Sequence, residues 1–531
     1  MSKLLQKVFL FLVISLFAFP LVSLISILFT EQQSAKWAIH TLLFEYTTNT
    51  IILMTGVGII SFIFGVISSW FVTFFSFPGR KFFEIFLFLP ISIPGYIVSF
   101  VYTNVLEYSG PIQSLLREIF HLQKNDYWFP EIRSLGGGIL ILGFTLFSYV
   151  YILARSSFTS LNNSVTVAST LGQSPFKIFT SIALPAARPA IIAGILLIFM
   201  EVIADFGTSQ ILAISTLTTG VYRTWFLLHD RYSATILSII ELSIIVLFVI
   251  AEKVSNNKQK LYSSIIINSD YQRRWSVDNK ILLVSIYFIC VLPILIGFIF
   301  PIIPLIYWTA QRTSFFINDL KFYIAIINSV GVALVAGSIL VIISLTIAYT
   351  ARYSKITYYI ARVMSMGYAI PSAIVAIAML TFLGKLSSFI SRYTVGITLI
   401  GTIGALLYSY IFRFFAIAFK TIEAGLSKIP NEIDWASYTM GHSPTATCIN
   451  IHIPLIKKSV LFSFLLAFID IIQELTATLI IRPFNFETLT TRMYELICDE
   501  RYMDAAPLAI VIVLIGLMSV TVLLKLSNTN K

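Results

Sequence analysis

Residues 172–185 read GQSPFKIFTSIALP, and residues 441–454, which lie 269 positions further on, read GHSPTATCINIHIP. Each stretch begins with a glycine and ends at a proline, within Ile-x-Leu-Pro in the first and Ile-x-Ile-Pro in the second. The glycine permits a sharp turn, and the proline can occupy the first turn of a helix. A spacing that recurs in this way predicts two similar halves joined head to tail.

Other features recur at nearly the same offset. The recurring positions are acidic residues and a threonine pair: Glu201 with Asp470, Asp205 with Glu474, and Leu217-Thr218-Thr219 with Leu489-Thr490-Thr491. Parallel repeats in a membrane protein imply a pathway along the axis between the halves. The predicted organisation is a first half over residues 1–254, a cytoplasmic linker over residues 255–280 and a second half over residues 281–531.

The composition excludes an ordinary soluble fold. Of the 531 residues, 57% are hydrophobic and 11% are charged, whereas soluble proteins have about 25% charged residues. The apolar stretches are about as long as the roughly 20 residues that cross a bilayer as a helix. The sequence therefore predicts an all-α polytopic membrane protein with about twelve transmembrane helices in two parallel six-helix repeats.

The basic residues indicate the orientation in the membrane. Most of the 36 Lys and Arg residues fall in loops on one side of the predicted spans. Because cytoplasmic loops carry an excess of Lys and Arg, both termini and both repeated loops are predicted in the cytoplasm. The net charge of +11 is then a topology signal, and no basic folded domain points to nucleic acid binding.

The repeated loops, Thr166–Pro185 and Trp435–Pro454, combine small residues, a glycine and a helix-starting proline, which suits a docking element. They resemble the coupling loop of permease subunits of binding-protein-dependent ABC importers, which reads Glu-Ala-Ala, three residues, Gly, nine residues, Ile-x-Leu-Pro. Thr166 and Trp435 stand in place of the glutamate, and Asp434 is adjacent to it only in the second loop. The resemblance implies that the residues that couple to the ATPase are Ala168, Gly172, Leu184, Pro185, Ala436, Gly441, Ile453 and Pro454.

The same resemblance implies a type I ABC importer permease fold in the bacterial cytoplasmic (inner) membrane. The implied partners are two copies of an ABC ATPase subunit, which bind ATP and Mg, and a periplasmic or extracellular binding protein. This chain is expected to have no cofactor and no enzyme activity of its own. Its Gly384-Lys385 pair lacks the upstream glycine of a phosphate-binding loop.

A narrower resemblance concerns the substrate. Residues 200–226, and then residues 474–495, resemble the two halves of fused ferric-iron permeases within that superfamily. The resemblance implies ferric iron as the substrate, delivered by an iron-binding protein. Permeases for thiamine or polyamines remain the nearest alternatives.

Four acids are the candidates for the translocation path: Glu201, Asp205, Asp470 and Glu474. Each pair is spaced i, i+4, which in a helix would put both carboxylates on one face. Ionisable groups within a span usually face the bundle interior, a partner or water. The alternative is a structural role, in which Arg223 or Arg482 neutralises an acid at a helix end.

Two other classes of function remain open. An ion-coupled secondary transporter would also have repeats and intramembrane acids, but it would not require two matched cytoplasmic loops. A membrane-embedded enzyme would need a catalytic constellation, and the sequence has no His-Glu-x-x-His or Gly-x-Ser-x-Gly motif.

Overall fold

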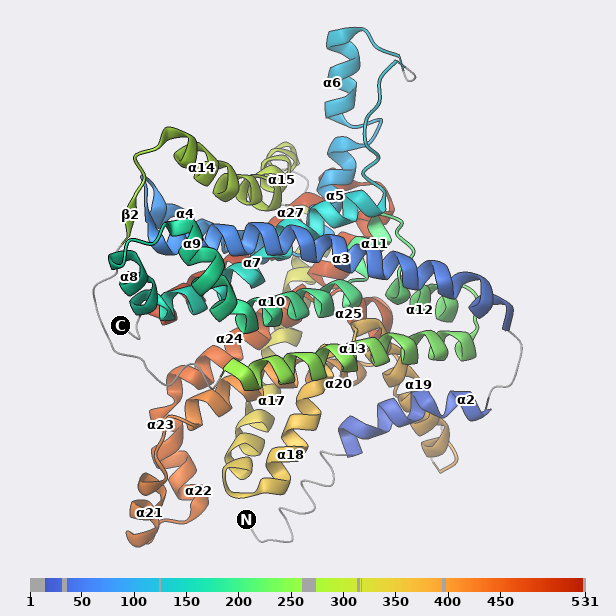
Figure 1. The fold of residues 1–531 in the computed structure, drawn as a ribbon. Helices are drawn as coiled ribbons and strands as arrows, with labels where there is room; N and C mark the ends of the chain where they lie inside the picture. The colour runs from blue at the N-terminus through green and yellow to red at the C-terminus, as the bar shows by residue number, and fades with distance from the viewer. Residues whose placement is uncertain are drawn as a thin grey trace. The chain divides into compact units, whose positions relative to one another are not determined.

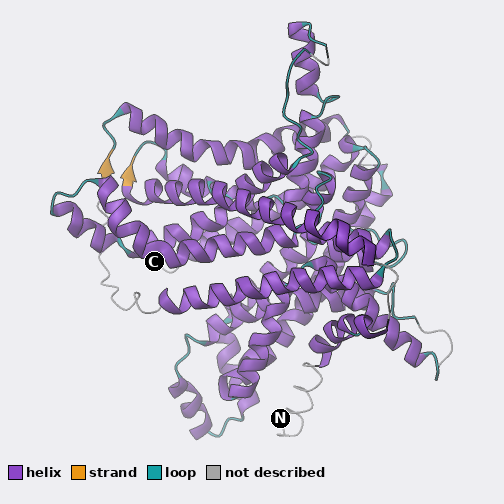
Figure 2. Cartoon of the chain, turned by 45° about the vertical axis from the view of Figure 1, so that its right-hand side comes forward, coloured by secondary structure: helices purple, strands orange, loops and turns teal. Residues whose placement is uncertain are grey.

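The computed structural model describes residues 15–30, 36–123, 126–259, 274–312, 316, 318–393 and 398–528. These residues form helices almost throughout (Figures 1 and 2). Two short strands within them, β1 (Phe75–Ser76) and β2 (Trp275–Ser276), pair in parallel. Residues 260–273 of the predicted linker lie outside the described residues.

The chain separates into two compact units. Unit I comprises Lys36–Arg223, Leu237–Thr313 and Asp499–Lys531, and unit II comprises Met1–Ala35, Thr224–Ile236 and Ser314–Cys498. Each unit draws segments from both predicted halves, so the compact units do not coincide with the sequence halves 1–254 and 281–531.

The helices of unit I, in chain order, are α3 (Lys36–Phe74), α4 (Arg80–Phe86), η1 (Leu89–Ser92), α5 (Gly95–Leu106), α6 (Pro111–Phe120), α7 (Leu135–Ser160), α8 (Asn162–Thr170), α9 (Pro175–Ile178), η2 (Phe179–Ala183), α10 (Leu184–Ala204), α11 (Gly207–Ile211), α14 (Lys280–Ile294), η3 (Leu295–Ile299), α15 (Phe300–Gln311) and α27 (Tyr502–Asn528). Two further helices have residues in both units: α12 (Leu217–Phe226) and α13 (Arg231–Gln259). Strands β1 and β2 also belong to unit I.

The helices of unit II are α2 (Ile27–Thr30), α17 (Leu320–Tyr353), α18 (Lys355–Met364), η4 (Ser365–Ala369), α19 (Ser372–Ile390), α20 (Ile403–Leu426), α21 (Asn431–Thr439), α22 (Pro444–Thr447), η5 (Cys448–His452), α23 (Ile453–Leu455), α24 (Lys457–Gln473), α25 (Thr476–Ile481) and α26 (Leu489–Cys498).

The internal repeat is visible as two triplets of packed helices. In unit I, α3, α7 and α10 pack on one another, and in unit II, α17, α20 and α24 do the same. The middle helix of each triplet has a hydroxyl cap: Ser134 Oγ accepts from Gly137 N, and Thr402 Oγ1 accepts from Ala405 N, both at 3.2 Å. The prediction of an all-α membrane protein with an internal repeat is confirmed.

The helices that could span a membrane can be compared with the predicted twelve only within the described residues. Within the described residues, eight helices are long and apolar enough to cross a membrane. A ninth candidate is a helix pair, Arg80–Ser92 and Gly95–Phe120, bent by 87°. The apolar helices Ser15–Phe29 and Tyr502–Met518 are shorter. Apolar runs locate the helices, but they do not show where the backbone turns away from the membrane normal.

Candidate functional site

The two candidate coupling loops share one backbone design. The helices α8 and α21 lead to Gly172 and Gly441, whose φ angles are +79° and +84°. Ser174 and Ser443 then cap the next helical turn by accepting a hydrogen bond from the backbone N–H three residues on. A Cβ on either glycine would meet nothing within 4 Å. The left-handed backbone, rather than crowding, is therefore what requires glycine here.

The loops differ in how they join the next long helix. Each loop continues through a π-helical turn, Phe179–Ala183 in unit I and Cys448–His452 in unit II. In unit I this turn runs on into α10, so that Pro175–Ala204 is one helical span of 30 residues. In unit II the helix ends after α23 at Ile456, which has φ −100° and ψ 14°, before α24 begins.

The interior of the second loop is polar. The buried Asp434 lies between Arg352 and His452: Nε of Arg352 is 2.9 Å from Oδ2, and Nε2 of His452 is 2.6 Å from Oδ1. Arg352 also donates to backbone carbonyls at and just after the end of α20. Ser437 Oγ and Thr447 Oγ1 are 2.8 Å apart. Burial lowers the pKa of His452, an effect that Asp434 opposes and Arg352 reinforces.

The interior of the first loop is apolar at the same positions. At the 269-residue offset, the residues equivalent to Asp434, Ser437, Thr447 and His452 are Val165, Ala168, Ile178 and Ala183, all buried. Aromatic rings anchor this loop instead. The ring of Phe179 lies 5.0 Å from that of Trp70 on α3 and 6.5 Å from that of Phe158 on α7, between centroids.

The residues implied as ATPase contacts differ in exposure. Ala168 is buried within its loop, so its methyl group packs inward. Of the others, Gly172, Ala436, Gly441 and Pro454 are exposed, and Leu184, Pro185 and Ile453 are half-buried. Two further residues, Leu171 and Met440, directly precede the glycines, are 76% and 77% exposed, and were not predicted from the sequence. An apolar residue at matching positions of both loops was the signal.

The second acid of each pair lies just beyond the end of a helix. The helices α10 and α24 end one residue before Asp205 and Glu474, whose backbones are extended. Each pair therefore does not lie within one helix, because the second acid is the C-cap residue at which the helix ends. Asp205 instead caps α11: its carboxylate accepts from Thr208 Oγ1 at 2.9 Å and from Ser209 N at 3.0 Å.

Glu474 is the corresponding cap in unit II, and it also has a basic partner. Its Oε1 accepts from Ala477 N at 3.0 Å, at the start of α25, and its Oε2 lies 3.2 Å from Nε of Arg413 on α20. The sequence analysis did not single out Arg413. The equivalent helix of unit I, α7, has no charged residue before Arg155. Asp205 therefore has no counterpart of Arg413 at that position.

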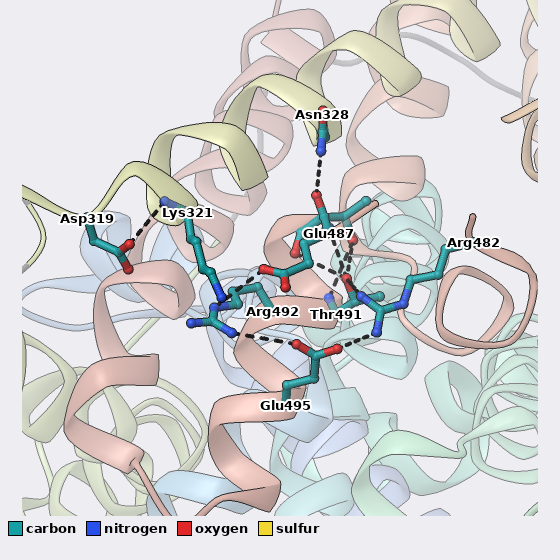
Figure 3. Close-up of polar contacts among 9 residues, drawn as sticks. Asp319, Lys321, Asn328, Arg482, Glu487, Thr491, Arg492 and Glu495 are labelled. Atoms are coloured by element: carbon teal, nitrogen blue, oxygen red, sulfur yellow. Dashed lines mark hydrogen bonds and ion pairs between the residues drawn. The ribbon is translucent and has the colours of Figure 1, made fainter. Parts of the chain in front are cut away.

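Arg482, which the sequence analysis considered as a counter-ion for an acid, belongs to a different cluster (Figure 3). Its guanidinium contacts Glu495 and donates to Thr491 Oγ1 at 3.2 Å. Arg492 lies 3.7 Å from Glu495 and 3.5 Å from Glu487, whose backbone carbonyl accepts from Asn328 at 2.9 Å. The cluster joins α26 to α17.

Two stretches of the chain, residues 61–259 and 341–528, match the family described as "Binding-protein-dependent transport system inner membrane component". Each stretch contains one candidate coupling loop, and together they make up more than half of the chain. The chain belongs to this family.

Individual relatives of the permease are distant but cover its length. It is 26% identical to Fe(3+)-transport system permease protein FbpB 2 of Haemophilus influenzae, over 91% of this chain and 90% of that protein. It is 20% identical to ferric transport system permease protein FbpB of Actinobacillus pleuropneumoniae, over 89% of this chain and 70% of that protein. The sulfate transport system permease protein CysT of Salmonella typhimurium is 25% identical over 27% of this chain and 50% of its own length.

One further buried acid of the permease is Glu241 on α13. It is fully buried, its Oε1 accepts from Thr218 Oγ1 at 2.5 Å, and its Oε2 has no hydrogen-bond partner among the described residues. An acid inside the apolar run 233–252 was the sequence signal. In the described part of the chain, no three His, Cys, Asp or Glu side chains group to hold a metal ion.

Proposed function

We propose that this permease carries ferric iron across the bacterial cytoplasmic membrane, after delivery by a periplasmic or extracellular iron-binding protein. One observation carries the proposal: relatives named as Fe(3+) or ferric permeases align with about nine tenths of the chain, through both halves. The sulfate permease aligns with about a quarter of it. The resemblance of residues 200–226 and 474–495 to fused ferric-iron permeases supports the same substrate.

The energy for transport would come from two copies of an ABC ATPase, one at each coupling loop, with both termini on the same cytoplasmic side. Support comes from the shared loop backbone and from the exposed apolar residues Leu171 and Met440 beside the glycines. Exposed apolar side chains next to a fixed turn suit a protein interface.

Within this proposal, Glu201, Asp205, Asp470 and Glu474 flank the path taken by iron. Carboxylate oxygens suit a hard cation, and acids at membrane depth are costly unless they have partners or a function. Asp205 and Glu474 also cap helices, so a substitution must separate the two roles.

The substrate is tested by reconstituting the permease with its ATPase and binding protein in vesicles and measuring uptake of radiolabelled ferric iron. We expect ATP-dependent uptake that excess thiamine, polyamine or sulfate does not reduce. Uptake of one of those solutes in place of iron would overturn the substrate. ATP hydrolysis by the purified permease alone, or failure to bind an ATPase, would overturn the role as a coupled permease.

The acids are tested by Asp205→Asn together with Glu474→Gln. Both amides retain an oxygen acceptor for the helix caps. Because Glu474→Gln also breaks the contact with Arg413, uptake is measured per folded permease. A path role predicts loss of iron uptake by the protein that folds, whereas a structural role predicts less folded protein with normal uptake per molecule. Normal uptake by the double variant would remove these two acids from the path.

A further inference from the structure

Polar side chains of α6 contact the segment that leads from it to α7, here called the return segment (residues 126–134). Gln113 is buried, and it donates to the carbonyl of Leu106 at 2.7 Å and accepts from the Tyr127 hydroxyl at 2.8 Å. Arg117 donates to that hydroxyl at 3.0 Å and to the carbonyl of Tyr108 at 2.9 Å. Gln113 and Arg117 thus find their hydrogen-bond partners within the hairpin itself.

The opposite side of α6 exposes several large apolar side chains, with Glu118 as the exposed charged residue at its edge. Leu115, Ile119 and Phe120 are 57%, 60% and 64% exposed, and Trp128 on the return segment is 85% exposed. Positions 115 and 119 lie one turn apart on the same helix face. A segment surrounded by water would be expected to hide such residues and expose its polar ones. This arrangement is the reverse, so the outer face requires an apolar surrounding.

The direction of α6 indicates what that surrounding is. Figures 1 and 2 show α6 extending away from the rest of unit I, across the direction of α3. The chain also bends by 87° between Arg80–Ser92 and Gly95–Phe120, the stretch that ends with α6. A helix that runs across the spans, with one apolar face, has the geometry of a helix lying in the plane of a membrane surface.

The chain connectivity gives the side of the membrane. The return segment enters α7 at its N-terminal end, and the first coupling loop follows the C-terminal end of α7. The 26 residues of α7 span about 39 Å. The hairpin and the coupling loop therefore lie at opposite ends of a spanning helix, so a cytoplasmic coupling loop puts α6 at the outer surface.

We propose that α6 and its return segment form an anchor that lies in the outer interface of the lipid bilayer. Leu115, Ile119 and Phe120 enter the acyl boundary, and Trp128 lies at the headgroup level, where tryptophan is enriched. Lipid is favoured over a protein partner because the helix lies across the spans and leaves its apolar face, rather than its polar one, uncovered.

The test uses the full-length permease in lipid nanodiscs, with the three native cysteines replaced. An environment-sensitive fluorophore is attached at Ile119→Cys or, as the matched control, at Glu118→Cys on the same helix. We expect lipids with a nitroxide near the headgroup to quench the first label several-fold more than the second. Aqueous iodide should show the reverse order.

A second pair of variants separates membrane contact from folding. Leu115→Glu with Ile119→Glu should release a fluorophore at Phe120→Cys from the lipid quencher, while binding of the ATPase partner remains. Equal quenching at positions 118 and 119 would overturn the proposal. So would a label at 119 that iodide reaches until the binding protein is added, because the face would then be a protein contact.

Discussion

The loop around Gly172 and the loop around Gly441 have the same turns, caps and π-helical segments, but different interactions hold them in place. An ion pair between Arg352 and Asp434, with His452 beside it, anchors the second. Apolar packing anchors the first. The shared turn is therefore set by the glycine and its neighbouring caps, and the interior of the loop can be either polar or apolar.

Substituting the glycines tests what the loops share, and we expect the largest effect there. A non-glycine residue in the left-handed region costs roughly 1–2 kcal/mol, and a β-branched one is disfavoured further. Gly441→Val and Gly172→Val should each reduce vesicle uptake below about a tenth of wild type at normal abundance. The matched control is Gly401→Val, which has φ +72° and open space but lies before α20, at the end away from the loop. Similar losses in all three would mean that strain alone, and not docking, explains the effect.

Removing Asp434 tests the polar anchor of the second loop. Loss of one partner of a buried ion pair costs about 3–5 kcal/mol, because the other charge stays buried without compensation. Asp434→Ala should therefore lower the midpoint of thermal unfolding of the purified permease. The control is Glu432→Ala, an exposed residue on the same helix α21, which should leave the midpoint unchanged. Equal midpoints for the two variants would contradict the anchor.

Removing Trp70 tests the aromatic anchor of the first loop. Trp70 is 4% exposed, and truncating such a side chain to alanine costs about 3 kcal/mol through lost packing and the cavity that remains. Trp70→Ala should destabilise the protein as measured by denaturant unfolding, and added salt should not alter the loss. Phe176→Ala, on an exposed ring of the same loop, is the control. If it destabilised the protein equally, the location of the anchor would be wrong.

The smallest effect is expected at the exposed residues Leu171 and Met440. Because their side chains contribute little to the fold, Leu171→Ser and Met440→Ser should weaken ATPase binding several-fold without changing thermal stability. Binding of the purified ATPase to nanodiscs measures this. We expect the double variant to lose more affinity than either single variant, since each loop would take one ATPase. Unchanged binding in the double variant would exclude these residues from the interface.

The sequence was sufficient for the helices, for the repeat and for the matching glycine turns of the two loops, because apolar runs and a glycine–proline spacing are local signals. It was insufficient where a contact joins distant segments. Arg352 and Asp434 are 82 positions apart, and neither position alone indicates the pair. The extended backbones at Asp205 and Glu474 were missed because an i, i+4 spacing assumes that the helix continues.

The break at Ile456 has a mechanical consequence. In unit I the loop and its span form one continuous helix of 30 residues, about 45 Å long, with Pro189 inside it, so a displacement of the loop is passed along an unbroken helix. In unit II the helix is broken at Ile456, between α23 and α24. A displacement of equal size there can bend the chain at this break before it moves the span. Equal displacements of the two loops would therefore move the two spans by different amounts. The first loop is continuous with its span, whereas the second is joined to its span through the break at Ile456.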